Sequence, residues 1–330
     1  MVIVDYSGTV ISVLYASRLM DMFDANRKEE PDINLVRHAV LNTLRSYKKM
    51  FRQKGSGEEM IIAADAGRSW RKDHYKYYKE NRKKNRDKSP TDWNSVFDAM
   101  NQILSEINDF TPLKTMKVHG AEADDIIAVL IEKHAEKYSE FGVNDNQSSH
   151  SLFDTAPDLH SNISFIVSED KDFHQLQKFA GVQQFYPRKK TFFIDKDPHD
   201  SLMKKIIFGD AGDGVPNILS DDDTFVSEKR QKVINEKRFS LIEPWAKRQI
   251  NIEDQLYCSN IKEPDIDVVS GWCRNRKMID LSFIPDIIKN NILQEYENKK
   301  ESEKNAAIML DYLFEHRCKN LVSDIQDFFN

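Results

Sequence analysis

Three short apolar runs in this sequence lead directly into acidic residues, and this pattern restricts the fold more than any other feature. The runs and the acids that follow them are 2–4 with Asp5, 60–64 with Asp65, and 163–167 with Asp170 and Asp172. Apolar runs of this length are typical of buried strands. In an open α/β sheet the functional site lies beyond the carboxyl ends of the strands. We therefore expect these aspartates to converge.

Helical segments alternate with these strands. Helical spacing of apolar residues covers 34–51, and Ser89-Pro90-Thr91-Asp92 predicts a helix start with Thr91 or Asp92 as the cap. Further helices are expected at 121–138 and 173–179, and further strands at 115–119, 182–186 and 191–194. The alternation indicates an α/β fold with a mostly parallel central sheet flanked by helices.

After Pro198 the strand signals end and the pattern becomes helical, which predicts two parts. Residues 1–197 are expected to form an α/β core that includes a basic segment at 66–92 and a polar, mobile loop at 142–161. Residues 198–330 are expected to form a helical subdomain with a tail at 321–330. A chain of 330 residues can form one large domain or two smaller ones.

Composition excludes several classes of protein. An apolar content of 40% and a charged content of 31% fit a soluble globular chain, and no apolar run approaches the ~20 residues of a membrane span. The first residues lack the basic region of a signal peptide. Cys258, Cys273 and Cys318 lie far apart, so neither a zinc site nor a disulfide framework is expected, and a reducing cytoplasm fits. The net charge is −6, yet residues 68–88 hold ten Lys or Arg and three acids, a basic island in an acidic protein.

Two further motifs add acids to those at the strand ends. "GAEADDIIAVL" places Glu122, Asp124 and Asp125 in the first turn of a helix, and "FGDAGDGVPNI" contains Asp210 and Asp213. Alone, the first motif could be ordinary helix-start chemistry, and a strand-end aspartate could simply close its strand. No Lys or Arg is regularly spaced among the acids to pair them, and unpaired they could not all ionise. Mg²⁺ prefers carboxylate and water oxygens, so we expect two Mg²⁺ ions about 4 Å apart around a scissile phosphate, with Mn²⁺ as a substitute.

Six motifs, in order along most of the chain, carry a resemblance to a known family. They are "IVDYSG", "IIAADAGRSWRKDHYKYYKENR", "EADDIIAVL", "VSEDKDFHQL", "FGDAGDGVPNI" and "MIDLSFIPDIIKNNI". The sequence resembles the flap-endonuclease-like 5′-nucleases, and among them the ribonuclease H group of T-even-type bacteriophages. The resemblance implies a PIN-like nuclease core and a helical part with a helix-turn-helix element that grips duplex DNA.

The resemblance also implies roles for the acids. The first Mg²⁺ would be held by Asp5, Asp65, Glu122 and Asp124, with Asp170 shared. The second ion would be held, partly through water, by Asp170, Asp172, Asp210 and Asp213. Asp125 would lie behind these metal ligands and support them. Such a site uses no amino-acid nucleophile, because activated water attacks the phosphodiester.

The basic segment "HYKYYKENR" resembles the arch that positions a 5′ single strand in this family, and Tyr78, Lys79 and Arg82 match its Y-K-x-N-R core. Lys79 and Arg82 are expected to contact the scissile phosphate as catalytic groups, and Arg71 and Lys72 to bind DNA. Candidates for stacking on unpaired bases are Trp70, Tyr75, Tyr77 and Tyr78. The alternative is a solvated basic helix face whose tyrosines pack inward.

The resemblance assigns duplex contacts and a partner to the C-terminal part. Gly212 and Gly214 would allow close approach to phosphate. Asp221-Asp222-Asp223 departs from the family's Gly-rich helix start and is expected to cap a helix, so that Lys229, Arg230 and Lys232 bind the DNA backbone instead. In the tail, Ile325, Phe328 and Phe329 are spaced like the plug of a sliding-clamp-binding peptide. The alternative is that these residues pack back onto the helical part.

Together these features predict a Mg²⁺-dependent 5′-to-3′ exonuclease and 5′-flap endonuclease with ribonuclease H activity. It would act as a monomer in the host-cell cytoplasm, on DNA and RNA–DNA duplexes with 5′ ends or flaps. It would remove RNA primers and adjacent DNA from lagging-strand fragments in phage replication. A sliding clamp and a single-strand-binding protein are the expected partners, and no membrane is involved.

Two rival functions were weighed against this one. A haloacid-dehalogenase-type phosphatase needs a second Asp two residues after its nucleophile, whereas Asp5 is followed by Tyr6 and Ser7. A non-catalytic DNA-junction-binding protein should have lost some ligands, whereas every expected acid is present. Metal-independent binding without cleavage would be the mark of the second rival.

Overall fold

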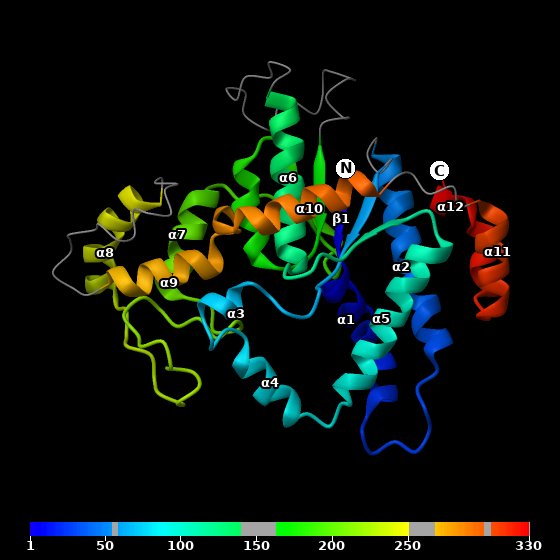
Figure 1. Cartoon of the computed structure of the whole chain (residues 1–330), viewed down its shortest axis with the longest axis horizontal. Coiled ribbons are helices and arrows are strands. Elements are labelled where there is room, and N and C mark those ends of the chain that lie inside the picture. The colour runs from blue at the N-terminus through cyan, green and yellow to red at the C-terminus, as the bar shows by residue number, and fades with distance from the viewer. Residues whose placement is uncertain (55–58, 140–162, 251–267, 300–304, 330) are drawn as a thin grey trace.

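A six-stranded sheet runs through the centre of the computed structural model (Figure 1), which describes residues 1–54, 59–139, 163–250, 268–299 and 305–329. The strands are β1 Val2–Asp5, β2 Met60–Ala63, β3 Lys114–Met116, β4 Ser164–Val167, β5 Val182–Tyr186 and β6 Thr191–Phe193. Their order is β3-β2-β1-β4-β5-β6, and only β6 is antiparallel to its neighbour. The predicted mostly parallel α/β fold is confirmed. The chain adds β2 and β3 on one side of β1 and then β4 on the other, so the topological switch point lies between β1 and β4.

The central strands are apolar at successive positions because helices cover both faces of the sheet. On one face Ile3, Ile61 and Ile166 belong to a cluster with helices α6 Ala123–Ser139, α7 Pro198–Phe208, α9 Val269–Ile279 and α10 Asp286–Asn298. On the other face Val4 and Ile62 pack with helices α1 Tyr6–Ala16, α2 Ile33–Gln53, α5 Trp93–Phe110 and α11 Ala306–Glu315. Both clusters contain side chains from each side of position 197.

Several predicted elements are confirmed and others differ. Asp92 caps α5 by accepting from the backbone N–H groups of Asn94 and Ser95. The helix predicted at 173–179 is a 3₁₀ helix, η3 Lys171–Lys178, whose first turn is closed by Asp170. Helix α1 follows β1 without a loop and was not predicted. The loop predicted at 142–161 and Cys258 lie outside the described residues.

The predicted helix cap at Asp221-Asp222-Asp223 is wrong. Residues 222–228 form turns, and the next helix is α8 Glu236–Gln249. The three acids serve instead as partners for bases: Asp222 pairs with Arg274 at 2.6 Å, and Asp223 pairs with Lys229 at 2.9 Å. Tertiary ion pairs therefore replace the local capping that the sequence suggested.

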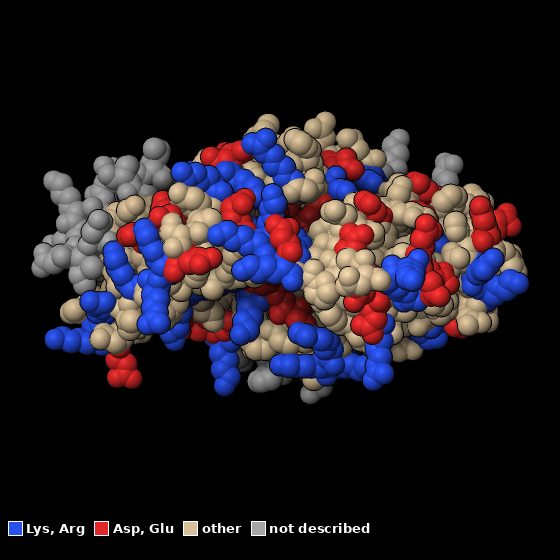
Figure 2. Space-filling model, turned by 90° about the horizontal axis from the view of Figure 1, so that it is seen from below, with Lys and Arg blue, Asp and Glu red and all other residues tan. Residues whose placement is uncertain are grey.

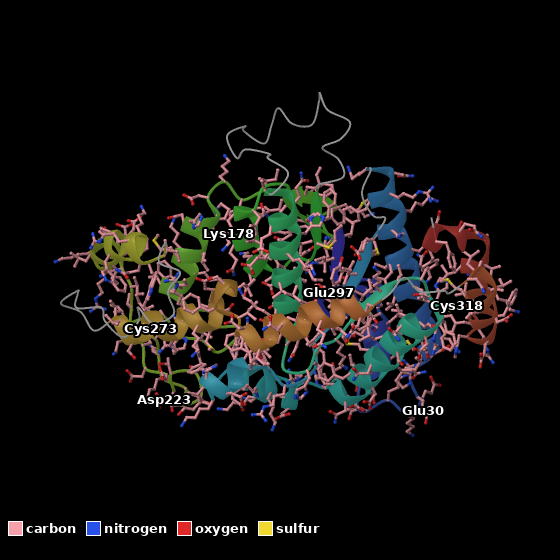
Figure 3. The ribbon with its side chains drawn as sticks, turned by 45° about the horizontal axis from the view of Figure 1, so that its top comes forward. Glu30, Lys178, Asp223, Cys273, Glu297 and Cys318 are labelled. Atoms are coloured by element: carbon pink, nitrogen blue, oxygen red, sulfur yellow. The ribbon has the colours of Figure 1, made fainter. Side chains whose placement is uncertain are left out.

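The basic segment 66–92 extends below the sheet, from β2 to the start of α5 (Figure 1). It contains two short helices, α3 Arg71–His74 and α4 Glu80–Asp87. We call residues 66–92 the arch. In Figure 3 the labelled Asp223 lies beside α3, which places the loop 209–235 next to the base of the arch.

The C-terminal helices pack against α2 and α5 on the second face of the sheet. After α11 come η6 Lys319–Asp324 and α12 Gln326–Phe329. Arg45 of α2 pairs with Asp324 at 3.1 Å and Asp327 at 2.8 Å. Phe328 is 1% exposed, whereas Phe329 is only partly buried. The tail thus packs back onto the molecule, but against α2 of the α/β core rather than against the helical part that the alternative named.

Two further observations concern the cysteines and the possibility of a membrane-spanning helix. Cys273 and Cys318 lie at opposite ends of the molecule (Figure 3), so they form no disulfide with each other. Among the described residues, no helix has both the length and the apolar character that crossing a membrane requires.

The burial of Phe328 predicts a stability difference between two neighbouring residues. Phe328→Ala is expected to lower the free energy of unfolding by about 3 kcal/mol, because it leaves a cavity in the core. Phe329→Ala is the matched control and should cost less than about half as much. Urea unfolding of the two variants measures this, and equal losses would contradict the packing described for α12.

Candidate metal centre

Asp5 is fixed at the topological switch point by two hydrogen bonds and by the close approach of Gly8. It caps α1, since its Oδ1 accepts from the backbone N–H of Gly8 at 3.0 Å. Ser168 Oγ donates to Asp5 Oδ2 at 3.0 Å. A Cβ on Gly8 would lie 2.4 Å from Asp5 Oδ2, so glycine is required there. These contacts hold the carboxylate between the ends of β1 and β4.

Asp65 ties the end of β2 to the start of α6. Its Oδ2 accepts from Ser7 Oγ at 3.0 Å, and its Oδ1 accepts from the backbone N–H of Ala123 at 2.8 Å. The second bond brings the first turn of α6, with Asp124, to the same edge of the sheet. Asp170 follows β4 and accepts from the backbone N–H of Asp172 at 2.9 Å.

Four of the predicted ligands, Asp5, Asp65, Asp124 and Asp170, influence one another without a basic partner. Burial, and then Asp65 and Asp170, raise the pKa of Asp5 to about 6. Burial, and then Asp170, raise the pKa of Asp124 well above its ordinary value, although Lys79 acts to lower it. Within the described ranges none of the four forms an ion pair with Lys, Arg or His. We call these four residues the unpaired acids.

The other predicted ligands are paired with bases, so the expectation that no Lys or Arg neutralises the acids is wrong. Lys79 Nζ lies 2.6 Å from Glu122 Oε1, and Arg82 contacts Asp213. Although burial acts in the opposite direction, Lys79 and Arg71 lower the pKa of Glu122 to about 2.

A further pair involves Lys205 of α7, which contacts Asp172 and lies 2.9 Å from Asp210 Oδ2. The bases that pair with the acids come from the arch and from α7. Most of these bases lie far along the chain from the acids that they contact, so local spacing in the sequence does not predict the pairs.

Asp125 has a structural role at the back of the site. It is fully buried, pairs with Arg71 at 2.9 Å, and accepts from Trp70 Nε1 at 3.1 Å. It also accepts from the backbone N–H of Glu122 at 2.9 Å. Because these donors surround its carboxylate, Asp125 is not in a position to bind a metal directly. Arg71 is only 2% exposed, and its side chain is engaged with Asp125 and Glu122, so its position does not favour the predicted contact with DNA.

The arch aromatics mostly pack inward. Tyr78 is 2% exposed, and its hydroxyl lies 3.0 Å from Glu122 Oε2 and 2.9 Å from Asp213 Oδ2, so two carboxylates share its single proton. Tyr75 and Trp70 are also buried. Base stacking by these three side chains does not fit this arrangement, whereas Tyr77 is partly exposed. The inward-packing alternative therefore describes most of the segment.

The residues predicted to contact duplex DNA differ in their exposure and in their partners. Gly214 has φ +72°, and a Cβ there would approach Tyr77 O at 3.1 Å, so this glycine serves contact with the arch base. Gly212 is exposed, and its carbonyl accepts from Arg82 Nε at 3.1 Å. The remaining bases, Lys72, Lys229, Arg230 and Lys232, are on the surface. Three of them pair with acids, Lys72 with Glu80, Lys229 with Asp223, and Lys232 with Asp221.

The donor set of the unpaired acids fits a hard divalent cation, because it consists of carboxylate oxygens that repel one another. In the described part of the chain, no three His, Cys, Asp or Glu side chains are already arranged to hold an ion. The bases that pair with the other acids account for part of this. Figure 2 shows acidic side chains in a recess near the middle of the lower face, with Lys and Arg around them.

Sequence reasoning missed Ser7, Ser168 and Lys205. Ser7 and Ser168 hold Asp65 and Asp5 in place. The signal for both was available, since each serine lies within two residues of a strand-end acid. Lys205 gave a weaker signal: Asp210 follows it within the next helical turns, but its other partner Asp172 lies more than thirty residues before it.

Two family models match the chain and define its class. The model described as the 5′-3′ exonuclease N-terminal resolvase-like domain matches residues 1–144, and the model of the T4 RNase H C-terminal region matches residues 197–328. Together they account for most of the sequence. The chain belongs to the 5′-nuclease family and is an enzyme of that class.

Individual relatives agree with this assignment. The chain is 26% identical to the ribonuclease H of Enterobacteria phage T4 over 305 residues, which are 91% of this chain and 89% of that protein. It is 29% identical to a 5′-3′ exonuclease of Mycoplasmopsis pulmonis over 162 residues, which are 49% of this chain and 46% of that protein.

Solved structures of phage T5 proteins share the fold. A T5 5′-exonuclease with bound zinc ions superposes with a TM-score of 0.53 at 15% identity, covering 100% of this chain and 99% of its own. A T5 flap endonuclease in a pseudo-enzyme-product complex with DNA and metal ions gives a TM-score of 0.54 at 16% identity, covering 90% and 98%.

The neighbours Asp124 and Asp125 are expected to respond oppositely to neutralisation. Asp125→Asn should lower the free energy of unfolding by about 3 kcal/mol, since it breaks a buried ion pair with Arg71. Asp124→Asn should raise stability in EDTA, because it removes a charge that burial and Asp170 disfavour. Urea unfolding in EDTA tests both, and a loss of stability in both variants would contradict the assigned roles.

Proposed function

We propose that this chain is a divalent-metal-dependent nuclease that cuts DNA and RNA–DNA duplexes with 5′ ends or flaps. The observation that carries the proposal is the convergence of the unpaired acids at the switch point of the sheet, next to a basic arch. The substrate class is supported by the relatives named ribonuclease H and 5′-3′ exonuclease, and by the T5 structure with DNA.

We further propose that the acids hold two Mg²⁺ ions, for which Mn²⁺ can substitute. The first ion would be held by the unpaired acids together with Glu122, and the second by Asp172, Asp210 and Asp213 with Asp170 shared. Bound divalent ions supply Lewis-acid stabilisation of the phosphate and lower the pKa of a water molecule. The serines that bond to Asp5 and Asp65 keep the carboxylates oriented for this role.

Lys79 and Arg82 are proposed to exchange carboxylate partners for the scissile phosphate. Lys79 has φ +58°, and its backbone N–H donates to Asp213 O at 2.8 Å, which fixes the base of the arch beside the acids. Its side chain and that of Arg82 already lie against Glu122 and Asp213. A phosphate that reaches the acids would therefore meet two positive groups without a large movement. These groups would stabilise the charge that develops on the phosphate.

The two parts of the chain share their hydrophobic clusters, but we propose that they have different functions. Residues 1–197 would carry the arch and most of the cutting site, to which residues 198–330 add Asp210 and Asp213. Residues 198–330 would also hold the duplex, with Gly212, Lys229, Arg230 and Lys232 toward its backbone. Binding should weaken with salt, because phosphate contacts release counter-ions. A role in removing RNA primers during phage replication follows from the similarity to phage ribonuclease H.

Binding of a sliding clamp through Ile325, Phe328 and Phe329 stays a prediction. Because Phe328 is buried against the core, this binding would require α12 to leave α2. A partnership with a single-strand-binding protein also stays a prediction.

The first test is cleavage of a nicked duplex with a 5′-labelled flap in Mg²⁺ and in EDTA. We expect short labelled products in Mg²⁺ and none in EDTA, and their length separates flap cutting from stepwise removal of nucleotides. Asp170→Asn should abolish cleavage while the variant still binds the substrate. Tight binding by the wild type without cleavage in Mg²⁺ or Mn²⁺ would instead identify a junction-binding protein.

Lys79→Ala is expected to reduce the single-turnover cleavage rate about 100-fold, as the loss of one charge-stabilising group typically does. Lys83→Ala removes the same charge from an exposed position of the arch and is the control. It should change substrate affinity more than the rate at saturating enzyme. Equal rates for the two variants would remove the proposed role of Lys79.

A further inference from the structure

A lysine that sequence analysis did not identify lies among the acids proposed to hold the second ion. Lys205 contacts Asp172 and lies 2.9 Å from Asp210 Oδ2. The side chains of Lys205 and Asp210 are 22% exposed and that of Asp172 is 14% exposed, so these ion pairs are largely shielded from water. In the described part of the chain, no other Lys or Arg pairs with either acid. One ammonium group therefore joins two carboxylates from separate segments of the chain.

Lys205 also affects the pKa of its partner Asp210. Burial acts to raise the pKa of Asp210, yet the Lys205 ammonium and the backbone N–H groups of the following turn hold it below its ordinary value. Asp172 Oδ1 is buried and accepts no other hydrogen bond from the described residues. Without Lys205 these two carboxylates would face each other in a poorly hydrated space, which disfavours two negative charges.

We propose that Lys205 is an internal counter-ion that competes with the second divalent cation for Asp172 and Asp210. This inference rests on the proposed function. The ammonium group and a divalent cation cannot occupy the same oxygens, because like charges at that separation repel strongly. The second cation therefore binds only when the Lys205 side chain leaves these carboxylates. Breaking the ion pairs of Lys205 costs free energy, and this cost makes the binding free energy of that cation less favourable.

Of the groups proposed for the first cation, only Glu122 pairs with bases, whereas all three acids proposed for the second cation alone are paired, so the two cations bind with different affinities. The first cation relieves the repulsion among Asp5, Asp65, Asp124 and Asp170 and displaces no base from them. The second cation replaces a positive charge that is already present. Over a range of cation concentrations the protein thus holds one ion, with Lys205 neutralising the acids of the second position.

The test is titration of the metal-free full-length protein with Mn²⁺, followed by calorimetry and by the electron paramagnetic resonance signal of free Mn²⁺. The wild type should show one tighter and one weaker site. Lys205→Met should strengthen the weaker site by about tenfold or more and leave the tighter site unchanged, since tenfold corresponds to about 1.4 kcal/mol of removed competition. Lys205→Arg keeps the positive charge and should retain the weaker affinity.

Lys204→Met provides a matched control on the same helix. Lys204 pairs with Asp200 at 2.7 Å and is half exposed, so its removal changes the net charge equally at a position away from the acids. It should leave both affinities unchanged. Thermal unfolding checks that each variant is folded, and Lys205→Gln offers the same test if Lys205→Met is not.

The outcomes separate this inference from the function on which it rests. An unchanged weaker affinity in Lys205→Met, or an equal gain in Lys204→Met, would overturn the competition while leaving the nuclease assignment intact. Absence of any Mn²⁺ binding by the folded wild-type protein would overturn both.

Discussion

Repulsion among carboxylates at one edge of the sheet is the interaction on which the other features of this molecule depend. The strand order places the ends of β2, β1 and β4 side by side, so the acids that follow these strands are forced together. Part of the charge is neutralised by bases from the arch and from α7. The remainder, on the unpaired acids, lowers the stability of the metal-free protein. Active sites commonly retain such unfavourable arrangements because the chemistry requires them.

The base of the arch is attached to the same acids. The Tyr78 hydroxyl lies between Glu122 and Asp213, which share its proton, and the backbone of Lys79 donates to Asp213. Tyr75 reaches the loop 209–235 through the carbonyl of Gly214. Any change in the position of Asp213 is therefore transmitted directly to the arch. The element expected to position a single strand and the element expected to hold a duplex therefore meet at Asp213 and at the turn that follows it.

Much of the fold was predictable because it depends on local patterns. Short apolar runs gave the strands, helical spacing gave α2 and α5, and Asp92 gave a helix start that the structure confirms. The approach of the strand-end acids was predictable too, since parallel strands end at one edge of a sheet.

What the sequence could not show were contacts between distant segments. Arg71 and Asp125 form a buried pair across more than fifty residues, and Lys205 reaches an acid in another part of the chain. A run of basic residues looks the same whether its members face solvent or carboxylates. For that reason Arg71 and Tyr78 were expected on a DNA-binding surface and are instead buried.

The position of α11 and α12 has a consequence for how the protein is made. These helices complete the hydrophobic cluster formed with α2 and α5, which are synthesised early, while α11 and α12 are synthesised at the end of the described chain. That face of the sheet can close only after residues 305–329 have left the ribosome. Domains generally fold as units during synthesis, and exposed apolar faces at that stage attract chaperones and other chains. A nascent chain of this nuclease therefore keeps one side of its core open until α11 and α12 have emerged.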